Sequence, residues 1–251
     1  MDDDLDRHLI ELDPDQNYFE NSINENHVFT TYSSFDELLN LNPVALIDNN
    51  FITVFSQNIR SLNRNLDSFL IMFPEESMSD VFIFSETWHD GNTPVNIPGY
   101  VGHHTVRQGR SGGVSVFVKS QLNSSFIEQL SYANETIEIC TVKVSSLNHQ
   151  IYVCGIYRPH SDNIENFGSS LENILNNNQL TNSTCIFAGD FNINLLSIGE
   201  GAGRFLDMMR THHYLQTIAD VTHPGHGLSA PSLIDHMWLN QLCRYNCGVL
   251  N

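Results

Sequence analysis

Basic side chains are scarce in this sequence, and long apolar runs are missing from it. The 251 residues contain only 11 lysines and arginines against 29 aspartates and glutamates, for a formal net charge of −18. No apolar stretch approaches the ~18 residues that a membrane-spanning helix needs, so we expect no membrane segment. There is also no Gly-X-Y period and no heptad pattern, which excludes collagen-like and coiled-coil proteins.

The N-terminus lacks the features of a secretory signal peptide, because the first methionine is followed by three aspartates. Cysteines are few, and their odd number of five argues against a disulfide framework. Cys140, Cys154 and Cys185 lie in apolar runs, where a free thiol behaves as a small apolar group. Cys243 and Cys247 have no second Cys/His pair close by, so they give little support for zinc. We therefore expect an intracellular protein of the cytoplasm or nucleus that is not secreted.

The acidic residues are concentrated at the start of the chain. Residues 1–50 carry twelve acids against one base, Arg7, which gives this segment a net charge of −11. High charge with few aliphatic residues is typical of disorder. We predict that residues 1–50 form an acidic, largely disordered segment, in which Ser34 and Glu37 cap one short helix. The alternative is an acidic segment that binds a partner.

Residues 51–251 have the apolar periodicity of a domain that mixes strands with helices. The predicted strands are Ile52–Ile59, Val81–Ser85, Gly112–Lys119, Thr136–Val144, Gln150–Tyr157, Thr184–Ala188 and Leu233–Leu239. The predicted helices are Leu62–Phe73, Asn163–Asn176 and Phe205–Leu215. Because the strands arrive in groups, the pattern favours an α/β (α+β) sandwich of antiparallel sheets with helices on the outer faces.

Unusual polar residues stand at the ends of the predicted strands. They are Asn58, Glu86, Tyr157, Asp190, Asn192 and Asp235. One such residue is usually a turn former, but strands that share an end can bring all six into one cleft. Because Asp190 and Asn192 are two residues apart, an extended backbone would point both side chains the same way. Carboxylate and amide oxygens are the ligands that Mg²⁺ prefers, so the set predicts Mg²⁺-dependent hydrolysis of a phosphoester.

The segments around these residues resemble the endonuclease/exonuclease/phosphatase superfamily, and above all the apurinic-like endonuclease domain of LINE (non-LTR) retrotransposon polyproteins. The similar segments, in the family's order, are Gln57-Asn58-Ile59-Arg60-Ser61-Leu62, Ser85-Glu86-Thr87-Trp88, Gly112-Gly113-Val114, Ile156-Tyr157-Arg158-Pro159, Gly189-Asp190-Phe191-Asn192 and Ser232-Leu233-Ile234-Asp235-His236. Gly-Asp-Phe-Asn is shared across the superfamily, whereas the last segment points to the retroelement branch. The resemblance implies one domain over residues 51–251, a four-layer α/β sandwich of two mainly antiparallel sheets flanked by helices.

The resemblance also implies a metal site and a catalytic set. Glu86 matches the principal metal carboxylate, Asn58 an amide near the metal and the phosphate, and Asp190 a carboxylate near both metal and water. The expected metal is Mg²⁺, with Mn²⁺ as a substitute. The implied catalytic residues are Tyr157, which contacts the scissile phosphate, Asp190, which positions or deprotonates the attacking water, Asn192, which orients that water, and Asp235, which hydrogen-bonds a catalytic histidine.

The substrate implied by the resemblance is DNA, nicked at a target site, and the implied partner is a reverse transcriptase in the same parent polyprotein. Four residues of the matching motifs are expected to contact the substrate: Arg60, Arg158, Ser232 and His236. Charge argues against strong DNA binding, because lysine and arginine contacts to phosphate supply most of the affinity. Residues 51–251 carry 17 acids and 10 bases, a net charge of −7.

The sequence departs from the family's pattern at its C-terminus. The family ends with a Ser/Thr-Asp-His motif before a final strand, and this sequence stops at Asn251, where that loop would begin. We therefore expect the last catalytic histidine and the last strand to be missing, and the chain to be a fragment with impaired activity. His236 is a poor substitute, because neighbours on a strand face opposite sides. Two alternatives stay open: a catalytically dead retroelement remnant, and a superfamily hydrolase acting on RNA, an inositol phosphate or a phospholipid.

Overall fold

The structure is a computed structural model that describes residues 28–32, 52–72, 79–109, 111–145, 150–160, 163–197, 199–225, 230–240 and 246–250. Seven strands form the larger sheet, in the order β11-β12-β10-β9-β8-β6, with β7 paired to β8. They are β6 (Asn123–Phe126), β7 (Tyr132–Ala133), β8 (Glu138–Ser145), β9 (Gln150–Tyr157), β10 (Thr184–Asp190), β11 (Leu215–Gln216) and β12 (Asp235–Leu239). β9 and β10 run parallel, whereas the other pairings in this sheet are antiparallel.

The smaller sheet has four strands in the order β2-β3-β5-β4. They are β2 (Val54–Asn58), β3 (Val81–Ser85), β4 (Tyr100–Thr105) and β5 (Val114–Lys119). β2 and β3 run parallel, and the helix α3 (Leu62–Met72) connects them. Helix α3 packs its Phe69 edge-on against Phe82 and Phe84 of β3, with ring centroids 5.2 and 5.0 Å apart. An aromatic core therefore fills the space between α3 and the outer face of this sheet.

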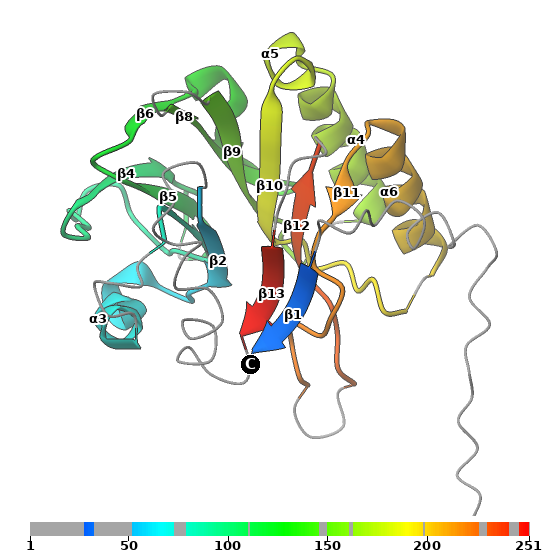
Figure 1. Cartoon of the computed structure of the whole chain (residues 1–251), viewed down its shortest axis with the longest axis horizontal. Coiled ribbons are helices and arrows are strands. Elements are labelled where there is room, and N and C mark those ends of the chain that lie inside the picture. Colours follow the sequence, from blue (N-terminus) through cyan, green and yellow to red (C-terminus); the bar gives the residue numbers. More distant parts are fainter. Residues whose placement is uncertain are drawn as a thin grey trace, which may run out of the picture.

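The outer face of the larger sheet is covered by helices. They are α4 (Ile164–Leu175), α5 (Asn178–Thr181) and α6 (Glu200–Thr211). The Asn163 side chain accepts from the backbone N of Glu165 and caps the start of α4. Figure 1 shows α4 and α6 together on one side of the molecule, with the two sheets next and α3 on the opposite side.

Branched apolar residues fill the space between the two sheets. Val114 and Val116 of β5 pack with Val142 of β8 and Val153 of β9 in one buried cluster. Gly155 of β9 lies where the sheets approach closely, since a Cβ there would come within 2.8 Å of Val114 Cγ1. The order of helices, sheet, sheet and helix confirms the predicted sandwich of two mainly antiparallel sheets.

The predicted elements are mostly present, but one helix is shifted and several short elements were not predicted. Helix α6 begins at Glu200 and ends at Thr211, earlier at both ends than predicted. Gly201 and Gly203 disfavour helix intrinsically, but Ala202 packs into the core and fixes the first turn. Strand β4 was not predicted, because two histidines and a glycine break its apolar pattern. The short elements β1, β6, β7, β11, β13 and α5 were not predicted either.

A third, two-stranded sheet joins the two ends of the described chain. In it β1 (Val28–Tyr32) pairs in parallel with β13 (Asn246–Leu250). β1 falls in the segment predicted to be largely disordered. The rest of residues 1–50, with the predicted Ser34–Glu37 capping box, lies outside the described residues, as does Cys243.

Three cysteines of the described chain are free and buried, as their apolar surroundings predict: Cys140, Cys154 and Cys185. Burial raises the pKa of the Cys140 thiol to about 12, so this thiol stays protonated and acts as a small apolar group. None of the described helices has both the length and the apolar character to cross a membrane.

Candidate active site

One end of the larger sheet carries a row of polar side chains. The strand register pairs Glu138 of β8 with Tyr157 of β9, and Tyr157 with Asp190 of β10. Asp190 in turn pairs with Asp235, the first residue of β12. Directly paired residues point to the same face of a sheet. Because Tyr157 packs in the core between the sheets, the whole row faces the smaller sheet.

Asn58, the last residue of β2, joins this row to the smaller sheet. Its Nδ2 donates to Glu86 Oε1 and to Asp190 Oδ2, both at 2.8 Å. Its Oδ1 accepts from the backbone N of Arg60 at 3.2 Å. The structure thus brings together the three residues expected to bind metal.

This donor set fits a divalent cation of the Mg²⁺ class. The carboxylates of Glu86 and Asp190 converge on one amide, and Asn58 Oδ1 adds a neutral oxygen nearby. Mg²⁺ is usually held by one or two carboxylates, with waters and substrate phosphates completing its shell. Within the described ranges, no three His, Cys, Asp or Glu side chains form a group that could hold a metal. The described residues therefore suit Mg²⁺ better than a closed zinc site of four protein ligands.

Backbone hydrogen bonds on both sides hold the segment that carries Glu86. Its carbonyl accepts from the backbone N of Ser61, just before α3, at 2.8 Å. On the other side, the N–H groups of Thr87 and Trp88 donate to the carbonyls of the Gly112-Gly113 turn, at 3.2 and 2.8 Å. The loop is therefore tied to α3 and to the start of β5 at once.

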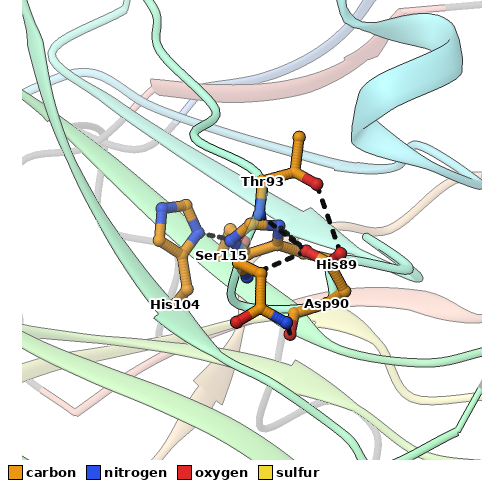
Figure 2. A network of polar contacts seen from close by, with 6 residues as sticks. His89, Asp90, Thr93, His104 and Ser115 are labelled. Atoms are coloured by element: carbon orange, nitrogen blue, oxygen red, sulfur yellow. Dashed lines mark hydrogen bonds and ion pairs between the residues drawn. The ribbon is translucent and has the colours of Figure 1, made fainter.

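The residues that follow are anchored by an aspartate and a pair of histidines (Figure 2). Asp90 accepts from Thr93 twice, from its backbone N at 2.9 Å and from its hydroxyl at 3.2 Å. The backbone N–H of Thr93 is the main reason why the pKa of Asp90 lies below its usual value. The ring of His89 lies 4.7 Å from that of His104 between centroids, and His104 Nδ1 lies 2.8 Å from the hydroxyl of Ser115. These contacts fix the loop against β4 and β5.

Five residues next to the site have left-handed backbone conformations although none is glycine. They are Arg60 (φ 47°), Ser61 (φ 93°), Glu86 (φ 50°), Trp88 (φ 50°) and Asn192 (φ 50°). Such positive φ angles are uncommon for residues with a side chain. Each occurs just after a strand of the site, so the chain turns sharply where the polar side chains are presented.

Burial raises the pKa of acidic groups in the row. For Asp190, burial is the main cause of the raised pKa, and the charge of Glu86 adds to the rise. Hydrogen bonds from the Asn58 amide and from the backbone N of Asn192 lower the same pKa. Burial also raises the pKa of the Tyr157 phenol, and the carboxylates of Glu86 and Asp190 reinforce the effect. Asp190 is therefore a better proton acceptor than an exposed aspartate, and Tyr157 stays a protonated hydrogen-bond donor.

Asp235 has the largest resolved shift among the carboxylates. Burial, reinforced by the neighbouring charge of Asp190, raises its pKa to about 7 from 3.8, and a hydrogen bond with Thr222 only partly opposes this. The folded state therefore binds the Asp235 proton more strongly than the unfolded state does. The resulting stability is complete below pH 3.8 and is lost as the pH rises to about 7.

We expect Asp235→Asn to stabilise the protein at pH 8 and to have little effect near pH 4, since a neutral amide resembles the protonated acid. Urea unfolding in EDTA, followed by circular dichroism at both pH values, measures the difference in midpoints between variant and parent. Burial also lowers the pKa of His104 to about 4 and that of His236 to about 3. These histidines destabilise the fold in acid in both proteins and cancel in the difference. Equal differences at pH 4 and pH 8 would contradict the raised pKa of Asp235.

The side chains of Asn192 and Arg158 each donate a hydrogen bond to the backbone carbonyl of the other residue. Asn192 Nδ2 donates to the carbonyl of Arg158 at 2.7 Å, and Arg158 Nη1 donates to the carbonyl of Asn192 at 2.9 Å. The expectation of an extended backbone from Asp190 to Asn192 is wrong, because β10 ends at Asp190 and Asn192 is left-handed. Arg158 is only 6% exposed, so its guanidinium braces the loop after β10 rather than lying open to substrate.

His236 does not lie with the other candidate site residues. It is 1% exposed on the opposite face of β12, where its ring stacks on Phe191 at 4.7 Å between centroids. Its Nε2 lies 2.9 Å from the carbonyl of Ile193. The expected substrate contact of His236 is therefore replaced by a structural role in the core. Arg60 is exposed next to Asn58, and Ser232 pairs through its backbone with His223.

Sequence reasoning missed one carboxylate of the row. Glu138 is fully buried and contacts Arg107 and the backbone N of Gly113. A lone acid in an otherwise apolar predicted strand was the available signal. His160 was also missed; it follows Tyr157-Arg158-Pro159 and acts electrostatically on Asp190.

Comparison with models of protein families assigns the chain to one family. The model of the Endonuclease/Exonuclease/phosphatase family matches residues 53–251. The chain therefore belongs to this family, as the strand-end motifs indicated. A search among curated proteins found none that matches the sequence.

Solved structures with the same fold include several nucleic-acid enzymes. The endonuclease domain of TRAS1, a telomere-specific non-LTR retrotransposon, matches with a TM-score of 0.61 and 13% identity, over 76% of this chain and 85% of that one. The 3′ phosphatase NExo from Neisseria, bound to a product DNA hairpin, matches with a TM-score of 0.54 and 12% identity, over 76% and 87%. D. rerio TDP2, complexed with a single-strand DNA product, matches with a TM-score of 0.51 and 13% identity, over 75% and 83%. At these identities the likeness establishes the fold.

Proposed function

We propose that this chain is a Mg²⁺-dependent phosphodiesterase that nicks DNA, of the kind encoded by LINE-type retrotransposons. The observation that carries the proposal is the convergence of two carboxylates on Asn58, each 2.8 Å from its Nδ2. Tyr157 stands next to Asp190 in the strand register. A carboxylate pair beside a protonated phenol suits an anionic substrate only if a cation offsets the negative charge, as a metal-bound phosphate does.

The residues of the chain divide the reaction between them. Bound at Glu86, Asp190 and Asn58, Mg²⁺ (or Mn²⁺) would supply the positive charge that the pentacovalent phosphate requires. Asp190 accepts the proton of the attacking water, for which its raised pKa suits it. Tyr157 donates a hydrogen bond to a non-bridging phosphate oxygen. Water forms the new P–O bond while the bond to the leaving oxygen breaks. The leaving oxygen takes a proton from solvent, and Asp190 later returns its proton to solvent, which leaves a phosphate end and a hydroxyl end.

An exposed aromatic ring beside the metal carboxylate supports a nucleic acid as the substrate. Trp88 follows Glu86 by two residues and is 41% exposed. Exposed indole faces stack on nucleobases, and this binding does not depend on sequence. The TRAS1 domain, NExo and TDP2 are each described with DNA or as an endonuclease, which favours DNA. A hydroxyl end made by nicking would suit priming by a reverse transcriptase of the same polyprotein.

The charge of the chain limits how tightly it binds DNA. Two arginines of the site region already have partners: Arg107 is paired with Glu138, and Arg158 with the carbonyl of Asn192. Arg60, two residues after Asn58, is exposed. Phosphate contacts supply most of the affinity for DNA and make it salt-dependent. We therefore expect weak binding with a shallow salt dependence.

Plasmid nicking with purified protein tests the proposed activity. We expect supercoiled DNA to be nicked in Mg²⁺ and left intact in EDTA. Glu86→Gln removes one negative charge from the carboxylates proposed to bind the metal. It should lower the rate about 100-fold, because a metal contact is worth several kcal/mol in the transition state. Part of the loss should be recovered by raising the Mg²⁺ concentration.

The same assay separates the alternatives. Parallel reactions with RNA, an inositol phosphate and a phospholipid would detect a different phosphoester substrate. A folded protein that cleaves none of these substrates would overturn the proposed activity and favour a catalytically inactive retroelement remnant. Glu172→Gln serves as the matched control and should leave nicking unchanged. It removes one charge from the exposed face of α4, where Glu172 Oε1 lies 3.6 Å from His212 Nε2.

A further inference from the structure

Glu138 is a fully buried carboxylate with two partners on the smaller-sheet side. Arg107 Nη1 donates to Glu138 Oε1 at 3.0 Å, and the backbone N of Gly113 donates to Oε2. Arg107 is 25% exposed whereas the Glu138 side chain is 0% exposed. A buried carboxylate is retained at a cost unless it is paired and hydrogen-bonded, and here both partners belong to the segment between β4 and β5.

The turn at Gly112-Gly113 is packed between Glu138 and the loop of Glu86. Both glycines have a φ of +88°. A Cβ on Gly112 would lie 2.5 Å from Glu138 Oε1, and a Cβ on Gly113 would lie 2.5 Å from Thr87 Oγ1. Only glycine therefore fits at either position of this turn, which lies in close contact with Glu138 and Thr87.

The same turn holds the backbone next to Glu86. Its two carbonyls accept from the N–H groups of Thr87 and Trp88, at 3.2 and 2.8 Å. The chain of contacts thus runs from the Glu138 carboxylate through the turn to the residue directly after Glu86. Every link is a hydrogen bond or a close packing contact.

We propose that Glu138 is a positioning residue that sets the metal carboxylate Glu86 in place through the Gly112-Gly113 turn. This inference rests on the proposed function, because it assigns Glu86 to the metal. Removing a residue that orients a metal ligand, without itself binding the metal, typically lowers metal affinity or activity ~10–100-fold. Glu138 acts on the Glu86 loop through the backbone of Gly113, which donates to Glu138 and accepts from Thr87.

Mn²⁺ binding to the full chain, followed by the electron paramagnetic resonance signal of free Mn²⁺, tests the proposal without reference to activity. We expect Glu138→Gln, which keeps the size of the side chain but not its charge, to raise the Mn²⁺ dissociation constant about tenfold. The matched control is Val142→Ala, a truncation at another fully buried position of β8. It should lower the urea midpoint and leave the dissociation constant unchanged. Nicking by Glu138→Gln should recover at high Mg²⁺.

If Glu138→Gln does not fold, Arg107→Gln alters the same carboxylate from its partly exposed side and should raise the dissociation constant several-fold. A folded Glu138→Gln or Arg107→Gln whose dissociation constant stays within twofold of the parent would overturn the positioning role. In that case, nicking by the parent would leave the proposed function standing. Conversely, a parent that binds Mn²⁺ but does not nick would reject the nuclease and retain the positioning role, provided that Glu138→Gln weakens binding. A parent that binds no Mn²⁺ would reject both.

Discussion

Asp190→Asn should slow DNA nicking by ~10³–10⁴-fold, since it removes a general base that also faces the metal. Asparagine keeps the shape and one hydrogen-bonding oxygen, but it cannot take the proton of the attacking water. The two Asp190 oxygens accept from Asn58 Nδ2 at 2.8 Å and from the backbone N of Asn192 at 3.1 Å, so asparagine gives up one of these hydrogen bonds. Single-turnover nicking at saturating Mg²⁺ measures the effect.

The control for this variant is Asp207→Asn on the exposed face of α6, where the carboxylate lies 3.7 Å from Arg210 Nη1. It makes the same chemical change at the surface and should nick like the parent. Circular dichroism should show that Asp190→Asn keeps the fold of the parent, so that a lost activity reflects the missing carboxylate. A nicking rate within tenfold of the parent would remove Asp190 from the role of base.

Gly189→Ala should unfold the protein or cost it more than ~3 kcal/mol of folding free energy, within the range of the most severe single substitutions. Gly189 has a φ of +145°, and a Cβ there would lie 1.9 Å from the carbonyl oxygen of Ile156 on the parallel strand β9. Backbone cannot move aside as a side-chain end can, so β10 would have to separate from β9. Asp190 is the next residue, and its position would be lost with the pairing.

Gly168→Ala provides the matched comparison, since its Cβ would meet only Met208 Sδ at 3.9 Å. Gly168 lies within α4, where alanine should stabilise by ~0.5–1 kcal/mol. Urea denaturation of both variants, followed by circular dichroism, separates the close approach at Gly189 from a general effect of losing a glycine. A Gly189→Ala protein as stable as the parent would show that β10 and β9 can part at little cost.

Local patterns predicted those elements whose burial is regular along the chain. Val81–Ser85 and Gln150–Tyr157 were predicted to the residue, because one is a continuous apolar run and the other is buried almost throughout. Strand β4 was missed because its residues are only half-buried and its stability comes from pairing with β5. Tertiary contacts, rather than local preference, also set where α6 begins.

The sequence predicted the site residues that lie in motifs at the ends of strands. It did not predict those whose role depends on contacts with residues far away in the sequence. Asn58, Glu86 and Asp190 come together as the strand ends indicated, although their roles as metal ligands stay predictions. Glu138 contacts a turn that lies 25 residues earlier in the sequence, and no local spacing reveals such a pairing. His236 lies on the face of β12 opposite to Asp235, as the alternation of side chains along a strand predicts, although its motif had suggested a substrate contact.

The left-handed residues around the site also bear on how this protein would respond to selection for stability. Five of the six described non-glycine residues with positive φ lie in the site loops, and His213 is the exception. Each such residue costs of order 1 kcal/mol or more relative to an unstrained conformation. Glycine at Trp88 would relieve this strain, and a screen for heat resistance would enrich it, yet the indole would be lost. Stability and the proposed substrate binding by Trp88 therefore compete at this position, and gains in stability without that penalty should be sought in α4 and α6.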